Sequence, residues 1–463
     1  MPPGWVSLAL LARPDADAPW AGMGHPIGAM PGRGREGMFQ GSIMGQGQTA
    51  ALRLRPVGTW QRLRRRLRYL GPGFLVTAGF IDPGNWAANL SAGTRHGYAL
   101  LWVVAAASLL LAVVQHASAR LGIGSGLCLA EAASRYLPRP QSRVLLWSAL
   151  LATVATLYAE LLGVGIGVRM MTGLPLQVGA TLAALVVGGA LLGSGYLRLE
   201  RWLVALVSLV GVAFLYEVWV APVDWRAAAA GTLLPSLPEG SALLIASIVG
   251  AVVMPHAVFL HSEAIQSRAW HVGSAEERRA RLALETFDTG LGVGVGWLIN
   301  SAMVVAVAAF FATRGPLEAL EDAHAALAPT FGRAAAAVFA LALCIAGLAA
   351  GITAALAGGS ISSGLLGHRF TRADTAGRWG VAGVIVGALA LALLPLEPLP
   401  ALLASQAVLS LQLPLTLGAL LWLTASRRVV GEQRQPAWQR TLLWAAAALV
   451  LVLDGAVLWQ AVA

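Results

Sequence analysis

One short stretch sets a carboxylate beside two helix-breaking residues and an amide. It reads Asp82, Pro83, Gly84, Asn85, and it lies in the middle of an apolar run. A charge at membrane depth costs several kcal/mol unless it is used, so the carboxylate indicates a functional site. Proline removes a backbone donor and glycine permits irregular dihedral angles, so we expect the helix to break here and expose the carbonyl of Gly79. The alternative is an unbroken, proline-kinked helix around a neutral acid.

A second stretch has the same design with different ligands. Met254, Pro255 and His256 set a thioether and an imidazole on either side of a proline, and His261 follows. Pro255 has no N–H, so the carbonyl of Ala251 loses its helical partner and becomes a possible ligand. Taken alone, the methionine would be packing and the first histidine a core residue. Two proline-interrupted spans at corresponding places in a chain instead point to the central site of a transporter.

The ligand types favour a divalent transition metal. Asp82 offers charge, Asn85 a neutral oxygen and Met254 a soft sulfur. Mg²⁺ and Ca²⁺ prefer shells made only of oxygen and gain little from a thioether. The spacing of His256 and His261 is five rather than the four of a zinc-protease helix, which excludes that type of enzyme.

The elements that must position these residues are membrane-spanning helices. The chain has 463 residues, of which 57% are hydrophobic and only 12% charged, whereas soluble domains carry roughly 25% charged residues. Apolar runs of about 20 residues, each long enough to cross a bilayer, recur along most of the chain. We expect an all-α integral membrane protein with about eleven transmembrane helices, near residues 71–93, 98–118, 143–170, 176–195, 201–221, 241–265, 288–312, 333–358, 379–396, 400–424 and 441–461.

Arginines predict how these helices cross the membrane. The net charge is +10, no lysine occurs, and the arginines form short blocks between apolar runs. Such blocks are topology signals rather than a nucleic-acid surface. They precede the first predicted span and follow every second one, so the N-terminus is expected in the cytoplasm and the C-terminus outside.

The chain divides into segments with this topology. Residues 1–52 are rich in Gly, Pro and Met and are expected to be a disordered extension, and 53–70 form a basic cytoplasmic segment. Residues 71–222 and 241–424 each hold five spans that begin on opposite sides of the membrane, so they form inverted repeats. Residues 441–461 add one further helix.

At these residues the sequence resembles the Nramp family of proton-linked divalent-metal transporters. The resemblance covers roughly residues 65–461, and it implies a LeuT-type fold of two inverted five-helix repeats plus one C-terminal helix. The motifs that carry it are Asp82-Pro83-Gly84-Asn85, Met254-Pro255-His256, Leu260-His261-Ser262, Gln266-Ser267-Arg268, and Ser405-Gln406 with Leu409-Ser410 and Leu413-Pro414.

The resemblance also implies roles for individual residues. The metal ligands would be Asp82, Asn85, Met254 and the carbonyl of Ala251, joined in some conformations by Gln406 and the carbonyl of Gly79. His256 and His261 would serve proton coupling or gating, and Arg268 would help close the cytoplasmic side.

One part of the family pattern is altered. Glu160 is present in the third span, but the position three residues earlier is Leu157 instead of the usual acid. Glu160 is a candidate proton relay, paired with Arg378, or else a member of a structural ion pair. Asn300 in the seventh span could position the broken helices or simply bond a neighbour.

We therefore expect a secondary-active, proton-coupled importer of Mn²⁺, Fe²⁺ and similar ions in a bacterial-type plasma membrane. It would work by alternating access, would not be an enzyme, and would need no cofactor besides its cargo and the co-transported proton. Its partners would be the lipid bilayer, metal ions and protons, with no nucleic acid. Two alternatives remain: the same fold carrying Mg²⁺ or an amino acid, and a metal sensor that does not transport.

Overall fold

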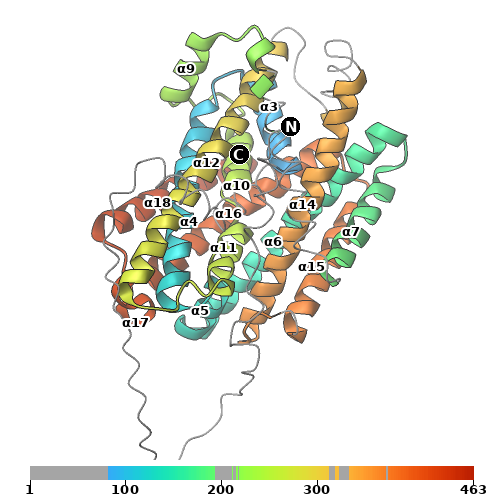
Figure 1. The fold of residues 1–463 in the computed structure, drawn as a ribbon. Coiled ribbons are helices and arrows are strands. Elements are labelled where there is room, and N and C mark those ends of the chain that lie inside the picture. The colour runs from blue at the N-terminus through green and yellow to red at the C-terminus, as the bar shows by residue number, and fades with distance from the viewer. Residues whose placement is uncertain are drawn as a thin grey trace, which may run out of the picture. The chain divides into compact units, whose positions relative to one another are not determined.

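The computed structural model describes residues 82–192, 211, 215–216, 218–311, 319–322, 333–371 and 374–462. Within these residues the chain is helical and contains no strand (Figure 1). The helices are α3 (Pro83–His96), α4 (Leu101–Ser125), α5 (Leu129–Tyr136), α6 (Arg139–Thr172), α7 (Leu176–Leu192), α9 (Trp225–Leu233), α10 (Ala242–Val252), α11 (Pro255–Ser267), α12 (Ala275–Phe311), α14 (Arg333–Leu365), α15 (Thr375–Ala392), α16 (Pro398–Ala425), α17 (Arg427–Val430), the 3₁₀ turn η2 (Gly431–Gln433) and α18 (Ala437–Val462).

Eight helical segments of the described part are long and apolar enough to cross a membrane, with α10 and α11 taken together as one segment. They match eight of the predicted spans, and a shorter apolar helix, Leu176–Leu191, matches a ninth. Most of the predicted fifth span, the first half of the first span, and segments 1–52 and 53–70 lie outside the described residues.

The helix that contains the predicted seventh span begins before that span. The helix α12 begins at Ala275, whereas the apolar run was predicted to start near residue 288, because the first turns of α12 carry charged residues that lower the hydropathy average. Glutamates and arginines favour helix as well as leucine does, so the helix continues where the hydrophobic run has stopped.

The first predicted break coincides with the start of α3. Asp82 is the N-cap residue, with φ −114° and ψ 165°, and Pro83 occupies the first turn. The backbone N–H of Asn85 donates to Oδ1 of Asp82 at 2.6 Å. The carboxylate therefore caps a helix that begins inside the membrane-spanning part of the chain.

The second predicted break is present between α10 and α11. The helix α10 ends at Val252, α11 begins at Pro255, and Met254 between them has φ −49° and ψ 119°. Pro255 has no N–H with which to complete a helical bond to the carbonyl of Ala251. The break that the sequence predicts is therefore seen at Met254.

Close packing brings the two breaks to the middle of the bundle. The ring of Pro83 fills the space that a side chain on Gly163 of α6 would need, and its Cγ would lie 3.3 Å from a Cβ on Gly347 of α14. The helix α3 also contacts α10, α12 and α16. Glycines at helix interfaces allow this close approach of backbones. One apolar core surrounds both breaks.

The helix α15 starts with a conventional cap at its exposed end. Asp374 accepts hydrogen bonds from the backbone N–H groups of Ala376 and Gly377 and from the hydroxyl of Ser363. Burial alone would raise the pKa of Asp374, but these hydrogen bonds outweigh it and hold the pKa below its ordinary value.

Candidate metal-binding site

Asp82 lies fully buried at the start of α3 with one carboxylate oxygen uncommitted. Oδ1 accepts the N–H of Asn85, while Oδ2 has no hydrogen-bond partner in the described part of the chain. A buried polar oxygen without a partner costs free energy, so its presence indicates that another group binds there. A bound cation would supply such a partner.

A cluster of three amides fixes the side chain next to it. The Nδ2 of Asn85 donates to Oδ1 of Asn300 at 2.9 Å, and the Nδ2 of Asn89 donates to the same oxygen at 3.1 Å. Asn89 also donates to Oδ1 of Asn85 at 3.0 Å. Asn300 on α12 thus orients the amide of Asn85, as one of its two predicted roles requires. Asn89 was not predicted as a site residue from the sequence, although it follows Asn85 by one helical turn.

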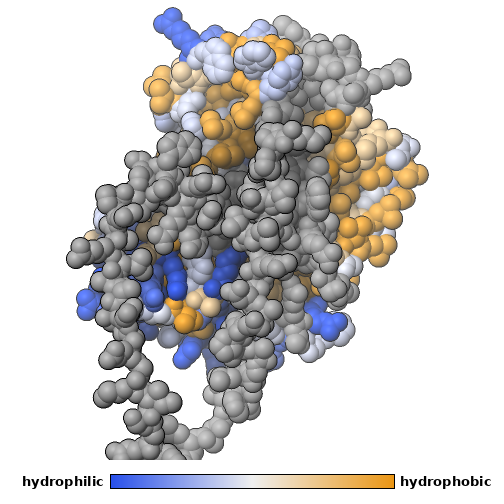
Figure 2. All heavy atoms as spheres, viewed as in Figure 1, coloured by the Kyte–Doolittle hydropathy of each residue, from blue (hydrophilic) through white to orange (hydrophobic). Residues whose placement is uncertain are grey.

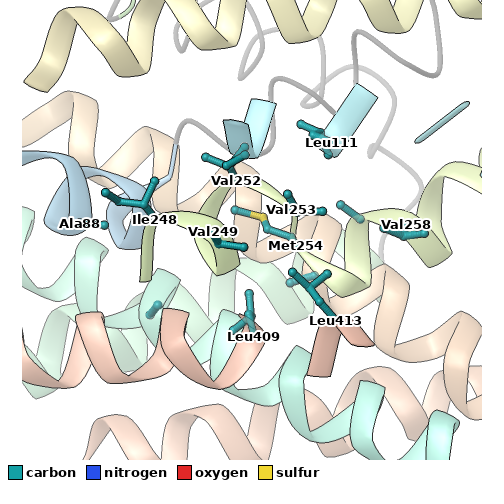
Figure 3. Packing of buried hydrophobic residues seen from close by; sticks show 14 of the residues in the cluster. Ala88, Leu111, Ile248, Val249, Val252, Val253, Met254, Val258, Leu409 and Leu413 are labelled. Atoms are coloured by element: carbon teal, nitrogen blue, oxygen red, sulfur yellow. The ribbon is translucent and has the colours of Figure 1, made fainter. Parts of the chain in front are cut away.

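Met254 lies at the break between α10 and α11 with only 1% of its surface exposed. Figure 3 shows its sulfur at this junction, near Val249, Val252 and Val253, while Leu409 and Leu413 of α16 lie on the other side. The carbonyl of Ala251 belongs to the last turn of α10, where Pro255 leaves it without a helical donor.

Gln406 on α16 touches the ends of both broken segments. Its side chain occupies the space that a Cβ on Gly84 of α3 would fill, and its backbone carbonyl does the same at Gly250 of α10. Its Nε2 donates to Oγ of Ser405 at 3.3 Å, while Oε1 has no partner in the described residues. Gln406 therefore brings a second uncommitted oxygen to the region of Asp82.

These groups form a mixed set of possible metal donors. It contains a carboxylate oxygen, amide oxygens, a backbone carbonyl and a thioether, from α3, the α10–α11 junction and α16. In the described part of the chain no cluster of three or more His, Cys, Asp or Glu side chains forms an alternative metal centre. The predicted ligand Gly79 lies outside the described residues.

The predicted pair between Glu160 and Arg378 does not form. Glu160 is fully buried in α6, and neither of its carboxylate oxygens has a partner in the described residues. Arg378 is exposed in the first turn of α15. Glu160 instead lies near the metal-binding region, because its carbonyl and the ring of Pro83 both approach Gly347.

His256 contacts the same face of α6. Its Nδ1 lies 3.2 Å from Oγ1 of Thr156, and its exposed fraction is 3%. Thr156 is one helical turn before Glu160 and adjoins Leu157, which is fully buried. The first histidine of the α11 motif and the acid of α6 therefore flank one short stretch of α6.

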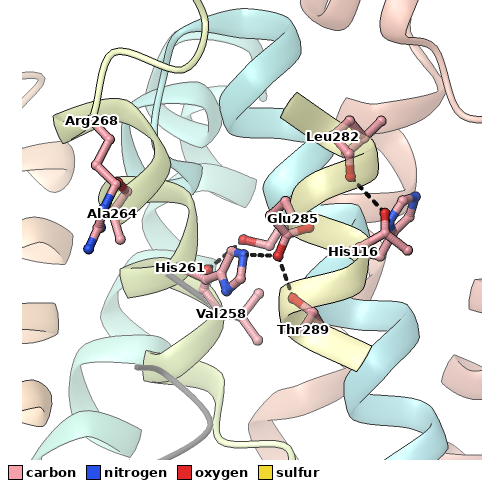
Figure 4. Close-up of polar contacts among 10 residues, drawn as sticks. His116, Val258, His261, Ala264, Arg268, Leu282, Glu285 and Thr289 are labelled. Atoms are coloured by element: carbon pink, nitrogen blue, oxygen red, sulfur yellow. Dashed lines mark hydrogen bonds and ion pairs between the residues drawn. The ribbon is translucent and has the colours of Figure 1, made fainter. Parts of the chain in front are cut away.

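His261 has an acidic partner that sequence reasoning missed. Its Nε2 lies 2.9 Å from Oε1 of Glu285 on α12, both side chains are fully buried, and Thr289 donates to the same oxygen (Figure 4). On the next residue, the hydroxyl of Thr286 lies 3.0 Å from Nδ1 of His116 on α4. Glu285 precedes the predicted start of the seventh span, and for that reason it was overlooked. The signal available in the sequence was an acidic residue directly beside a short apolar stretch.

Arg268, predicted to act in closing the cytoplasmic side, ends α11. It is exposed, and its Nη1 donates to the carbonyl of Ala264 in its own helix at 3.2 Å. Figure 4 shows it beyond Ala264, away from His261 and Glu285. The gating role of Arg268 stays a prediction.

Comparison with known protein families identifies the family to which this chain belongs. The family described as natural resistance-associated macrophage protein-like, Nramp, matches residues 73–460. The chain belongs to the Nramp family. A divalent metal cation transporter, MntH of Verminephrobacter eiseniae, is 36% identical over 399 residues, which cover 85% of this chain and 89% of that protein.

Solved structures agree with the Nramp assignment. The manganese transporter of Eremococcus coleocola, solved with an aromatic bis-isothiourea compound, superposes with a TM-score of 0.70 at 25% identity and covers 85% of this chain and 86% of that one. The nucleobase-cation symporter Mhp1 superposes with a TM-score of 0.57 at 15% identity, over 84% and 92% of the two chains. The predicted all-α, LeuT-like membrane fold is therefore confirmed for this Nramp chain.

Proposed function

We propose that this Nramp chain is a secondary-active importer of divalent transition-metal ions, coupled to protons, in a bacterial-type plasma membrane. The observation that carries the proposal is the buried, uncommitted carboxylate oxygen of Asp82 at a helix break, next to a second break that holds Met254. Relatives named divalent metal cation transporters support the choice of cargo.

The donor set supports a transition metal over the other cargoes considered. A thioether is a soft ligand that Mg²⁺ does not use, whereas Mn²⁺, Fe²⁺ and Co²⁺ accept mixed oxygen, nitrogen and sulfur shells. An amino acid could pair its amine with Asp82, but the buried sulfur of Met254 would then have no task.

The break geometry supports alternating access. A junction without helical hydrogen bonds bends more readily than a continuous helix, so α10 and α11 can tilt separately about Met254. The binding groups lie on both sides of such junctions, so tilting would expose the ion first to one side and then to the other. His256, Glu160 and the pair His261–Glu285 are the buried groups able to hold a transported proton.

The test is Mn²⁺ uptake into sealed vesicles that contain the purified full chain and a pH-sensitive dye. We expect Asp82→Asn to abolish uptake and the accompanying acidification, and Met254→Leu to reduce Mn²⁺ uptake while improving competition by Mg²⁺. The matched controls are Asp454→Asn, a buried acid on α18, and Met170→Leu on α6, and both should transport normally.

Three outcomes would contradict the proposal. Mn²⁺ binding without accumulation would identify a sensor. Accumulation blocked by excess Mg²⁺ or by amino acids in the wild type would identify another cargo. Uptake without any pH change would remove the proton coupling and leave the metal site in place.

A further inference from the structure

A basic pocket lies away from the metal site, where the start of α12 meets α17, η2 and the start of α18. Its volume is about 790 Å³, and its charged lining consists of Arg279, Arg427, Arg434, Arg440 and Glu432. Figure 2 shows hydrophilic residues gathered at this end of the molecule, where Figure 1 places α17. A volume of this size is typical of pockets that bind small molecules.

The positive charge of this pocket is largely unbalanced. Glu432 lies 3.6 Å from Arg279, but within the described residues Arg427, Arg434 and Arg440 have no carboxylate within 4.0 Å. The Nε of Arg434 donates to the carbonyl of Ala425 at 2.8 Å, which fixes the direction of that guanidinium group, and the Nε of Arg440 is buried without a partner. Three guanidinium groups that line one pocket, at least one of them held in place, favour an anion with several oxygens.

The pocket continues onto an apolar, outward-facing surface. Ala437, Arg440 and Trp444 follow one another at helical spacing on α18, so they share one face of that helix. Trp444 is 64% exposed, as is Trp438, and only 28% of the apolar window of α18 is buried. An exposed indole one turn beyond an arginine is the arrangement of a membrane interface, with the headgroup region at the arginine and acyl chains beyond the indole.

We propose that this pocket binds the phosphate headgroup of an anionic phospholipid whose acyl chains lie along α18. The arginine-rich connections of the chain mark this end of the bundle as the side that faces anionic lipid. The N-terminal segment 53–68 is not the complementary occupant, because it carries seven arginines. The bound lipid would link α12 to the α17–α18 junction, and this role is independent of the metal proposal.

The experiment compares two adjacent arginines. Arg427 lines the pocket and Arg428 does not, while both are exposed in α17. The purified full chain in detergent is titrated with phosphatidylglycerol or phosphatidylcholine, and bound lipid is counted by native mass spectrometry. We expect the wild type to retain phosphatidylglycerol preferentially, Arg427→Gln to weaken retention roughly fivefold, and Arg428→Gln to leave it unchanged.

Each remaining outcome decides the proposal. Equal losses in Arg427→Gln and Arg428→Gln would show that surface charge alone attracts lipid, and equal retention of both lipids would show that the headgroup is not recognised. Displacement of the lipid by millimolar inorganic phosphate would identify a site for a free anion. A misfolded Arg427→Gln would be detected by gel filtration. In that case the salt dependence of the wild type is measured instead. An arginine–phosphate site should retain less phosphatidylglycerol as the salt concentration rises, and unchanged retention would contradict the proposal.

Discussion

The amide cluster next to the metal-binding site makes the most specific prediction, the effect of Asn300→Leu. Oδ1 of Asn300 accepts hydrogen bonds from Asn85 and Asn89, at 2.9 and 3.1 Å, in a fully buried position. Leucine has the same branching and the same number of side-chain heavy atoms, but no acceptor. The substitution therefore removes the acceptor for one N–H of Asn85 and one N–H of Asn89. Only the bond from Asn89 to Oδ1 of Asn85 remains within the cluster, so the orientation of Asn85 is less firmly fixed, although residue 300 itself is not a proposed ligand.

Two separate magnitudes follow from this geometry. Hydrogen bonds between membrane helices contribute about 0.6 kcal/mol on average and rarely more than about 1.7 kcal/mol, so losing two lowers the free energy of unfolding by roughly 1–3 kcal/mol. Groups that orient a metal ligand typically change metal affinity by about 10- to 100-fold. We therefore expect a moderate loss of stability together with a large loss of Mn²⁺ affinity.

The assay measures Mn²⁺ binding by calorimetry and the thermal midpoint on the same detergent-solubilised samples. Gln412→Leu on α16 is the matched control, because Gln412 is also a buried amide with two side-chain hydrogen bonds, to Ser148 and from Thr416. It should lose similar stability and keep its Mn²⁺ affinity. Equal affinity losses in the two variants, or an unchanged affinity in Asn300→Leu, would refute the role assigned to the cluster.

Three further predictions concern packing, the histidine pair and a helix cap. Gly250→Ala should lower the free energy of unfolding by about 1–3 kcal/mol, and with it the thermal midpoint and Mn²⁺ uptake, because the new Cβ would meet the Gln406 carbonyl. Gly383→Ala on α15, where the space is open, should change neither quantity. Equal effects of the two substitutions would contradict the tight α10–α16 contact. In a double-mutant cycle of His261→Gln and Glu285→Gln, the free-energy changes obtained from uptake rates and from thermal midpoints should deviate from additivity by about 0.5–3 kcal/mol. Strict additivity would show that the two residues do not act as a pair. Asp374→Ala should cost about 0.5–2 kcal/mol near pH 7. Because the folded protein lowers the pKa of Asp374, this stabilisation is fully present above the unfolded pKa of about 3.9 and declines as the pH falls from there through the lower folded pKa; a difference in midpoint that does not shrink over that range would contradict it.

Features that depend on neighbouring residues could be predicted from the sequence, whereas contacts between distant residues could not. The break at Pro255 follows from residues a few positions apart and appears where expected, and a helix starts at Pro83 as the motif there predicts. The link between Asn85 and Asn300 joins residues 215 positions apart, and no periodicity reveals which buried amides meet.

Hydropathy does not give depth along a helix, and this accounts for both Arg378 and Glu285. Arg378 was expected beside Glu160, but it lies in the first exposed turn of α15. Glu285 was overlooked because α12 begins well before its apolar run, so a buried acid lay outside the predicted span. The contacts between helices, which sequence alone does not supply, decide both cases.

Pro255 has a consequence for how such a site can be gained or lost. Any other residue at that position would bring back one amide hydrogen, and the chain from Ala242 to Ser267 could then close into a single 26-residue rod. The hydropathy, the length and the outer packing of the segment would hardly change. The carbonyl of Ala251 would nevertheless accept a helical hydrogen bond, and the break at Met254 would be lost. The absence of one amide hydrogen thus keeps this membrane span from being a single continuous helix.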